Sequence, residues 1–232
     1  MSHLILAIDT THEAGSLALA SAGETALEME TIDEEVLRAP GGFAHVLYGH
    51  IAGMLRRNRL DLAAVDCFAA ASGPGSFTGV RVGLACVKGL AEALGKPAAG
   101  VSNLRAMAAF GAARLRAAVL DARRGEVYGA VYNAAGETVA REMVAPLPAW
   151  LESLPDGEIE FVTGGGLRPF QPQLAGTRFA EARVTAAPEA LAAAIARLAW
   201  QALLAGEAGD PAALDANYVR RSDAELFWKD TI

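Results

Sequence analysis

Several classes of chemistry lack their usual residues in this sequence. Only two of its 232 residues are cysteines, Cys67 and Cys86, and both lie in apolar surroundings. We therefore expect buried free thiols in a reducing compartment, without a disulfide framework or a CxxC redox motif. His45 and His50 are five residues apart in one expected helix. That spacing turns them about 140° from each other, so they do not chelate one ion and no metal site is expected.

Long apolar runs and an excess of basic charge are also missing. The run Leu4 to Ile8 is too short for a signal peptide or a membrane span, and Arg197 interrupts the alanine-rich stretch Ala190 to Leu204. The net charge of −7 disfavours nucleic-acid binding by the chain alone. No GK[ST] follows the glycine-rich segment, which excludes a phosphate-binding P-loop. We expect a soluble cytoplasmic protein with no membrane partner.

The sequence does contain one order of expected elements, β-β-β-α-β-α-β-α, and contains it twice. The first copy opens with the strand Leu4 to Asp9, and the second, less regular copy opens with Ala117 to Asp121. Hairpin-joined strands followed by alternating strands and helices predict an α/β fold of mixed sheets flanked by helices. The helices are expected at 43–57, 78–94, 103–115, 149–154, 168–174 and 188–204, with a late strand at 178–182.

This repeat predicts two lobes with a cleft between them. The expected N-terminal lobe covers residues 1–102 and the C-terminal lobe 103–232, with the helix 188–204 able to cross back to the first lobe. Apolar residues make up 53% of the chain, enough to bury a core in each lobe.

Two aspartates occupy matching places in the two copies. Asp9 and Asp121 each end a strand, and Thr10 and Thr11 follow the first of them. Carboxylates facing each other across a cleft suit Mg²⁺ and a nucleotide phosphate, and the glycines 164–166 would leave room for an adenosine. One hypothesis is therefore an autonomous actin-like Mg-ATP phosphotransferase or ATPase. Its alternative is structural, because aspartates often form turns and glycine triplets often form loops.

The most specific segment is Ser72-Gly73-Pro74-Gly75-Ser76-Phe77-Thr78-Gly79-Val80-Arg81-Val82-Gly83, between an apolar strand and a long helix. Its glycines suit either an anion at the helix N-terminus or close approach by another backbone. The helix is apolar nearly all round, which predicts burial on more than one side, by this chain or by another. Its second apolar face consists of the small residues Val82, Gly83, Cys86, Gly89 and Ala93.

Three segments together resemble one family. They are Ile5-Leu6-Ala7-Ile8-Asp9-Thr10, the stretch from Gly73 to Gly83, and Asp121-Ala122-Arg123-Arg124-Gly125-Glu126-Val127-Tyr128; Tyr218-Val219-Arg220 resembles the tail motif of the same family. That family is TsaB (YeaZ), and the resemblance spans essentially the whole chain. It implies the actin-like ATPase fold, with two duplicated ribonuclease H-like lobes.

The resemblance also implies a role. It implies a non-catalytic subunit of the bacterial complex that forms threonylcarbamoyladenosine in tRNA. The implied partners are an actin-like threonylcarbamoyltransferase subunit, which this subunit pairs with and activates, and a small ATPase subunit; tRNA is reached through the complex. No cofactor of its own is implied, and Mg-ATP would belong to the assembled complex.

Pairing in this family uses the two long helices of the first lobe, for the heterodimer and for self-association as a homodimer. The implied contact residues are Phe43, Leu47, Ile51, Ser76, Phe77, Thr78, Gly79, Arg81, Val82, Gly83 and Cys86. One position departs from the family, because Phe43 stands where a histidine is common and His45 is turned to another face. We expect Phe43 to act there as an apolar anchor.

Overall fold

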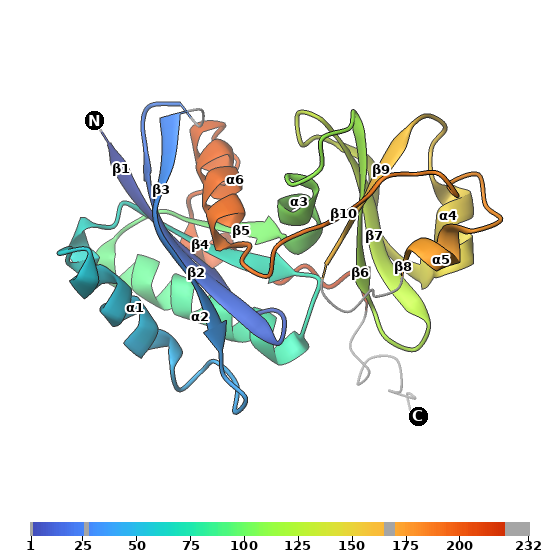
Figure 1. Cartoon of the computed structure of the whole chain (residues 1–232). Coiled ribbons are helices and arrows are strands. Elements are labelled where there is room, and N and C mark those ends of the chain that lie inside the picture. The colour runs from blue at the N-terminus through green and yellow to red at the C-terminus, as the bar shows by residue number, and fades with distance from the viewer. Residues whose placement is uncertain (1, 26–27, 165–169, 221–232) are drawn as a thin grey trace, which may run out of the picture.

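Two five-stranded sheets, one in each lobe, organise the molecule (Figure 1). The computed structural model describes residues 2–25, 28–164 and 170–220. The first sheet has the order β3-β2-β1-β4-β5 and contains β1 (His3–Asp9), β2 (Ala14–Ala22), β3 (Met29–Arg38), β4 (Cys67–Gly73) and β5 (Ala98–Ser102). The second has the order β10-β9-β6-β7-β8 and contains β6 (Leu115–Asp121), β7 (Glu126–Asn133), β8 (Thr138–Pro146), β9 (Ile159–Thr163) and β10 (Val184–Ala186).

The two sheets are built on the same topology. In the first, β1 pairs antiparallel with β2 and parallel with β4. In the second, β6 pairs antiparallel with β7 and parallel with β9. The predicted α/β class with duplicated lobes is therefore confirmed, and the arrangement is the actin-like one of two ribonuclease H-like lobes.

The helices are α1 (Leu47–Arg57), α2 (Phe77–Leu94), α3 (Asn103–Ala108), α4 (Leu147–Ser153), α5 (Gln171–Leu174) and α6 (Ala192–Leu204). Single 3₁₀ turns occupy Leu62–Ala64 and Pro211–Ala213. In the described ranges, none of these helices is both long enough and apolar enough to cross a membrane.

Several expected elements were wrong in place or length. The helices expected at 43–57 and 188–204 each begin four residues later, at Leu47 and Ala192. The helix expected over 103–115 ends at Ala108, because the buried Glu160 carboxylate accepts hydrogen bonds from the Ala112 and Ala113 amides and turns the chain toward β6. The strand expected at 178–182 lies instead at Val184–Ala186, where it pairs with β9. Residues 168–169 of the helix expected over 168–174 lie outside the described residues.

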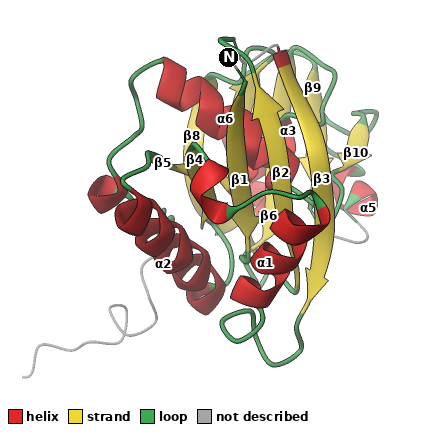
Figure 2. Ribbon diagram, turned by 90° about the vertical axis from the view of Figure 1, so that its left-hand side faces the viewer, coloured by secondary structure: helices red, strands yellow, loops and turns green. Residues whose placement is uncertain are grey.

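Helices cover both faces of the first sheet (Figures 1 and 2). Ile5 and Ala7 of β1 belong to the apolar cluster that contains α6, whereas Leu6 and Ile8 belong to the cluster that contains α1 and α2. This alternation follows from the two-residue period of a strand. Ser16 of β2 fixes the start of α6, since its hydroxyl accepts hydrogen bonds from the Leu191 and Ala192 amides at 3.1 Å.

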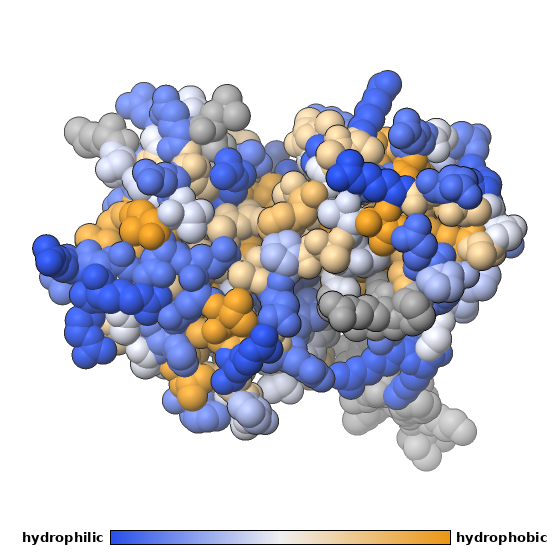
Figure 3. All heavy atoms as spheres, in the orientation of Figure 1, coloured by the Kyte–Doolittle hydropathy of each residue, from blue (hydrophilic) through white to orange (hydrophobic). Residues whose placement is uncertain are grey.

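The two lobes share part of their core. α6 follows β10 in the chain but packs on β1, β2, β4 and β5 of the first sheet, while α3 packs mainly on β6 and β7. The cluster around α6 contains residues of both sheets, among them Ile5 and Val162. On the face shown in Figure 3, strongly apolar groups form separate patches among hydrophilic ones.

Candidate functional site

The glycines of the segment 72–83 bring α2 directly against the turn that follows β1. A Cβ atom on Gly79 would overlap the Thr10 carbonyl oxygen, and one on Gly83 would lie 2.7 Å from Thr10 Oγ1. A Cβ atom on Gly75 would lie 2.6 Å from the Thr11 carbonyl oxygen. The Thr10 hydroxyl donates a hydrogen bond to the Gly79 carbonyl oxygen at 2.7 Å. Of the two uses expected for these glycines, the structure shows close backbone approach.

The N-terminal end of α2 is also bonded within the chain. The Ser76 amide donates to the Thr11 carbonyl oxygen at 2.7 Å, and the Ser76 hydroxyl accepts from the Gly79 amide at 3.3 Å. The Gly73 amide at the end of β4 donates to Asn103 Oδ1 at 3.1 Å. These amides, which an anion would otherwise use, already have protein acceptors.

The two matching aspartates differ in their surroundings. Asp9 is 1% exposed, and its Oδ1 accepts hydrogen bonds from the Thr11 amide at 2.9 Å and the Thr11 hydroxyl at 2.6 Å. Asn103 Nδ2 lies 3.5 Å from Asp9 Oδ2 and donates to Thr11 Oγ1 at 2.8 Å. Thr10 is as buried as its neighbours, whereas Asp121 is exposed and accepts from the Arg123 amide. Of the two carboxylates expected to face a cleft, Asp9 is therefore buried and hydrogen-bonded within the chain, and Asp121 is exposed.

The expected adenosine site is only partly described. Gly164 lies against the second lobe, where a Cβ atom would overlap Leu120 and lie 3.2 Å from Met107 Cε. Gly165 and Gly166 lie outside the described residues. Among the residues that the structure describes, no group of three or more His, Cys, Asp or Glu side chains is arranged to hold a metal ion.

Several expected contact residues lie inside the first lobe. The exposed fractions of Phe43, Leu47, Ile51 and Cys86 are 7%, 1%, 3% and 3%, and all four belong to one apolar cluster. The Phe43 ring occupies the space beside Gly15, whose Cβ atom would lie 2.9 Å from it. In the chain by itself these side chains pack into their own lobe, so their contact with a partner stays a prediction. Phe43 is an apolar anchor of this core.

One line of small residues on α2 stays open. Thr78, Ala85, Gly89 and Ala93 are exposed and Val82 is half-buried. Their spacing places all five on one side of the helix, turned by about 100° from the glycines that pack on Thr10. We call Thr78, Val82, Ala85, Gly89 and Ala93 the outer stripe. Of the remaining expected contact residues, Ser76, Phe77 and Arg81 are also exposed.

Helix α1 lies beside α2 on the same face of the first sheet (Figure 2). Burial raises the pKa of the Cys86 thiol to about 11. The proximity of Cys86 is the largest cause of the raised pKa of Tyr48, whose side chain is 58% exposed. Tyr48 of α1 therefore reaches α2 beside the outer stripe and remains open to solvent.

Residues 209–220 border the outer stripe on the other side, and we call them the strap. Gly209 exchanges two backbone hydrogen bonds with Ala98, at 3.0 and 3.1 Å. Lys88 Nζ donates to the Leu214 carbonyl oxygen at 2.7 Å, and Arg81 Nε donates to the Tyr218 hydroxyl at 2.9 Å. The strap thus follows α2 from its C-terminal half back to its first turns.

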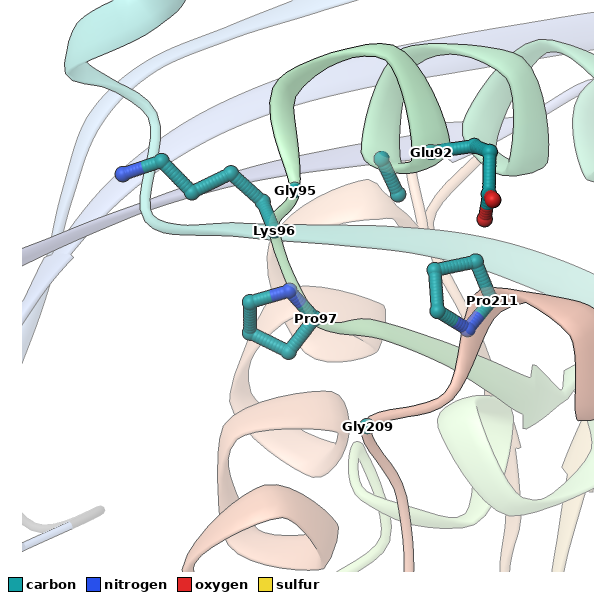
Figure 4. A pocket seen from close by; sticks show the side chains of 7 residues that line it. Glu92, Gly95, Lys96, Pro97, Gly209 and Pro211 are labelled. Atoms are coloured by element: carbon teal, nitrogen blue, oxygen red, sulfur yellow. The ribbon is translucent and has the colours of Figure 1, made fainter.

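A small depression of about 300 Å³ lies where the strap begins (Figure 4). Glu92 and Pro211 face each other across it. Lys96, which also lines it, directs its amine away, to Asp66 Oδ1 at 3.2 Å. Because an open, shallow depression offers few convergent groups, it is not a ligand site of the usual kind.

The second lobe holds the far end of the strap. Asn217 Nδ2 donates to Glu142 Oε2 at 2.6 Å, and Glu142 Oε1 accepts from the Tyr132 hydroxyl at 2.8 Å and from the Ser102 hydroxyl. Burial, followed by the neighbouring Glu142 carboxylate, raises the pKa of Tyr132. Arg220 donates to the Ala122 carbonyl oxygen at 2.8 Å and pairs with Glu126. Sequence reasoning missed Asn103, Glu142 and Asn217; the signal for this end of the strap was the motif Tyr218-Val219-Arg220.

The sequence of this chain is similar to a family model and to several named proteins. A family model described as "TsaD: tRNA N6-adenosine threonylcarbamoyltransferase" matches residues 42–204. The protein named "tRNA threonylcarbamoyladenosine biosynthesis protein TsaB" is 38% identical over 134 residues in Escherichia coli K12, covering 56% of this chain and 54% of that protein. Its namesake in Bacillus subtilis 168 is 40% identical over 104 residues, covering 42% and 45%. The chain spans about half the length of the curated relatives it matches.

A solved structure extends the likeness to the whole fold. The structure titled "YeaZ from Pseudomonas aeruginosa" is 28% identical, with a TM-score of 0.71 over 93% of this chain and 99% of that one.

Proposed function

Because this chain belongs to the TsaB (YeaZ) family and carries a TsaD-type domain, we propose that it is a subunit of the complex that forms threonylcarbamoyladenosine in tRNA. In this proposal it transfers no group itself. It pairs with the threonylcarbamoyltransferase subunit and activates it, and the small ATPase subunit and tRNA join the assembled pair. The names of its relatives and the two faces of α2 support the proposal.

The proposed pairing rests on the contrast between the inner face of α2, which packs on Thr10, and its exposed outer stripe. The inner glycines are held against Thr10, whereas Ala85 and Gly89 of the outer stripe are exposed. Small side chains let a second helix approach closely, and a face that is already formed needs little rearrangement on binding. Since the chain itself matches the transferase model, the partner is expected to carry equivalents of α1 and α2 and to present them to this face.

The closed surroundings of Asp9 support a non-catalytic role. Mg²⁺ carrying a nucleotide phosphate would have to compete for the Asp9 carboxylate with the donors of Thr11 and Asn103. We therefore propose that Mg-ATP binds to the assembled complex and that the isolated chain has no nucleotide site. Calorimetric titration of the isolated chain with Mg-ATP is expected to show no saturable heat. Saturable binding that disappears in Asp9→Ala would instead support the autonomous ATPase.

The pairing is tested by placing a charge on the outer stripe. Gly83 is unsuitable, because a Cβ atom there would press on Thr10 within the same chain. Ala85→Glu is suitable, since Ala85 is exposed, and Ala149→Glu is its matched control on the exposed side of α4. Burying an unpaired carboxylate in an interface is expected to weaken binding to the transferase subunit about 100-fold or more.

The readout is complex formation, followed by mass and by titration calorimetry, with circular dichroism as the folding control. The expected result is that the control variant binds like the unsubstituted chain while Ala85→Glu does not. Equal affinity of all three proteins would contradict pairing through α2.

A further inference from the structure

Exposed aromatic side chains gather around the outer stripe. Within the described ranges the exposed Phe and Tyr residues are Tyr48, Phe77, Phe110 and Tyr218, at 58%, 42%, 39% and 45%. The first borders the stripe from α1, the second begins α2, and the last comes from the strap. Phe110, which follows α3, stands apart from them. Three of the four therefore border one helix.

Two of these rings, Phe77 and Tyr218, contact each other and the side chain of Arg81. The Arg81 guanidinium carbon lies 3.7 Å from the centre of the Phe77 ring and 5.9 Å from the centre of the Tyr218 ring. The two ring centres are 5.4 Å apart, with their planes 31° from parallel. With the hydrogen bond from Arg81 to the Tyr218 hydroxyl, this gives a preformed surface of two aromatic rings and a cation. Tyrosine and arginine are the residue types enriched where interfaces gain most of their affinity.

The position of Tyr218 is fixed by residues on both sides of it in the chain, Asn217 and Arg220. The Asn217 amide donates to the Ser72 carbonyl oxygen at 2.8 Å, and its side chain donates to Glu142 of the second lobe. Arg220 is bonded to Ala122 and Glu126, also in the second lobe. The strap therefore holds Tyr218 beside the first turns of α2, and its ring is ordered before any partner arrives.

We propose that the strap is one wall of the docking face and that Tyr218 contacts the transferase subunit directly, with Asn217 and Arg220 as positioning residues. The inference rests on the proposed pairing through α2. A helix seated on the small residues of the outer stripe would lie between Tyr48 on one side and the Arg81–Tyr218 pair on the other. We assign this helix to the transferase subunit. The reason is that this chain matches the transferase family model over α1 and α2, so the partner is expected to have equivalent helices.

The test compares Tyr218→Ala, Tyr218→Phe and the matched control Phe110→Ala in the full chain, titrated with the transferase subunit. Tyr218→Ala removes the ring and is expected to weaken binding about tenfold. Tyr218→Phe keeps the ring but loses the hydroxyl that Arg81 bonds, so its loss is expected to be about threefold or less. Phe110→Ala is expected to bind normally. Near-ultraviolet circular dichroism reports whether each variant keeps its fold.

The contribution of the Arg81–Tyr218 contact is measured by a double-mutant cycle with Arg81→Gln. Coupling in partner affinity is expected, because the two side chains form one surface. If Tyr218→Ala binds like Phe110→Ala while Ala85→Glu still prevents pairing, the strap is not part of the interface and the proposed pairing stands. If Ala85→Glu pairs normally, both the pairing through α2 and the role of the strap are wrong.

Discussion

The two lobes share one topology but differ in the helix between their parallel strands. In the first lobe α2 runs for 18 residues between β4 and β5, whereas α5 between β9 and β10 has 4. The strand-end aspartate is buried in the first lobe and exposed in the second. The shared topology therefore accounts for the fold, and the surface that we assign to docking belongs to one lobe only. Three changes test this difference, from the largest expected effect to the smallest.

The first change adds one methyl group at a glycine in each lobe. Gly79→Ala places a Cβ atom on the Thr10 carbonyl oxygen, and Gly129→Ala places one on the Trp150 indole. A backbone contact relaxes less readily than a side chain, so Gly79→Ala is expected to lower the free energy of unfolding by about 3 kcal/mol or more, and Gly129→Ala by about 1 to 3 kcal/mol. Denaturant unfolding measures both. A loss under about 0.5 kcal/mol for Gly79→Ala would contradict the close approach of α2 to Thr10.

The second change neutralises the aspartate of each lobe. Asp9→Asn keeps an oxygen for the two Thr11 donors but removes the charge and places an NH2 group against Asn103 Nδ2, and is expected to cost about 2 kcal/mol of stability. Asp121→Asn alters an exposed side chain and is expected to change stability by less than about 0.5 kcal/mol. Thermal and denaturant unfolding decide between them. Equal losses in the two variants would show that Asp9 is not held as described.

The third change is in pH, and it reports on the first lobe alone because both cysteines lie there. Burial raises the pKa of Cys67 to about 12 and of Cys86 to about 11, from an ordinary value of 9.0. Since the folded state favours the protonated thiols, their contribution to stability is complete below pH 9.0 and is lost as the pH rises through about 11 to 12. We expect both thiols of the native chain to resist an aromatic disulfide reagent at pH 8 until the lobe opens. Rapid native-state labelling of either one would contradict their burial.

Much of the fold was predictable because local patterns carry it. The apolar runs of β1, β4 and β6 and the hairpins between β1, β2 and β3 predicted the order of elements along the chain and the mixed sheets, whereas the order of strands within each sheet comes from the structure. The end of α3 and the place of β10 were not predictable, because Glu160 sets the first and pairing with β9 sets the second. Both contacts join residues that are far apart in the chain.

The candidate site was predictable only where a local sequence pattern marks it. The sequence of α2 marks its small residues, yet it does not say which of them face inward. Gly83 and Cys86 pack inside, whereas Ala85 and Gly89 are open, and Thr10 decides the orientation. For the strap, the sequence offered only the resemblance of Tyr218-Val219-Arg220 to a family motif. Its course was not predictable, because the hydrogen bond from Asn217 to Glu142 joins residues 75 positions apart and follows no local pattern.

The most direct measurement of the central claim is hydrogen–deuterium exchange of the full chain with and without the transferase subunit at saturating concentration. The amides of α2 over 77–94 and of the strap over 209–220 are expected to gain protection, with little change in β8 of the second lobe. Protection confined to the second lobe, in a complex whose formation is confirmed by its mass, would contradict docking through the outer face of α2.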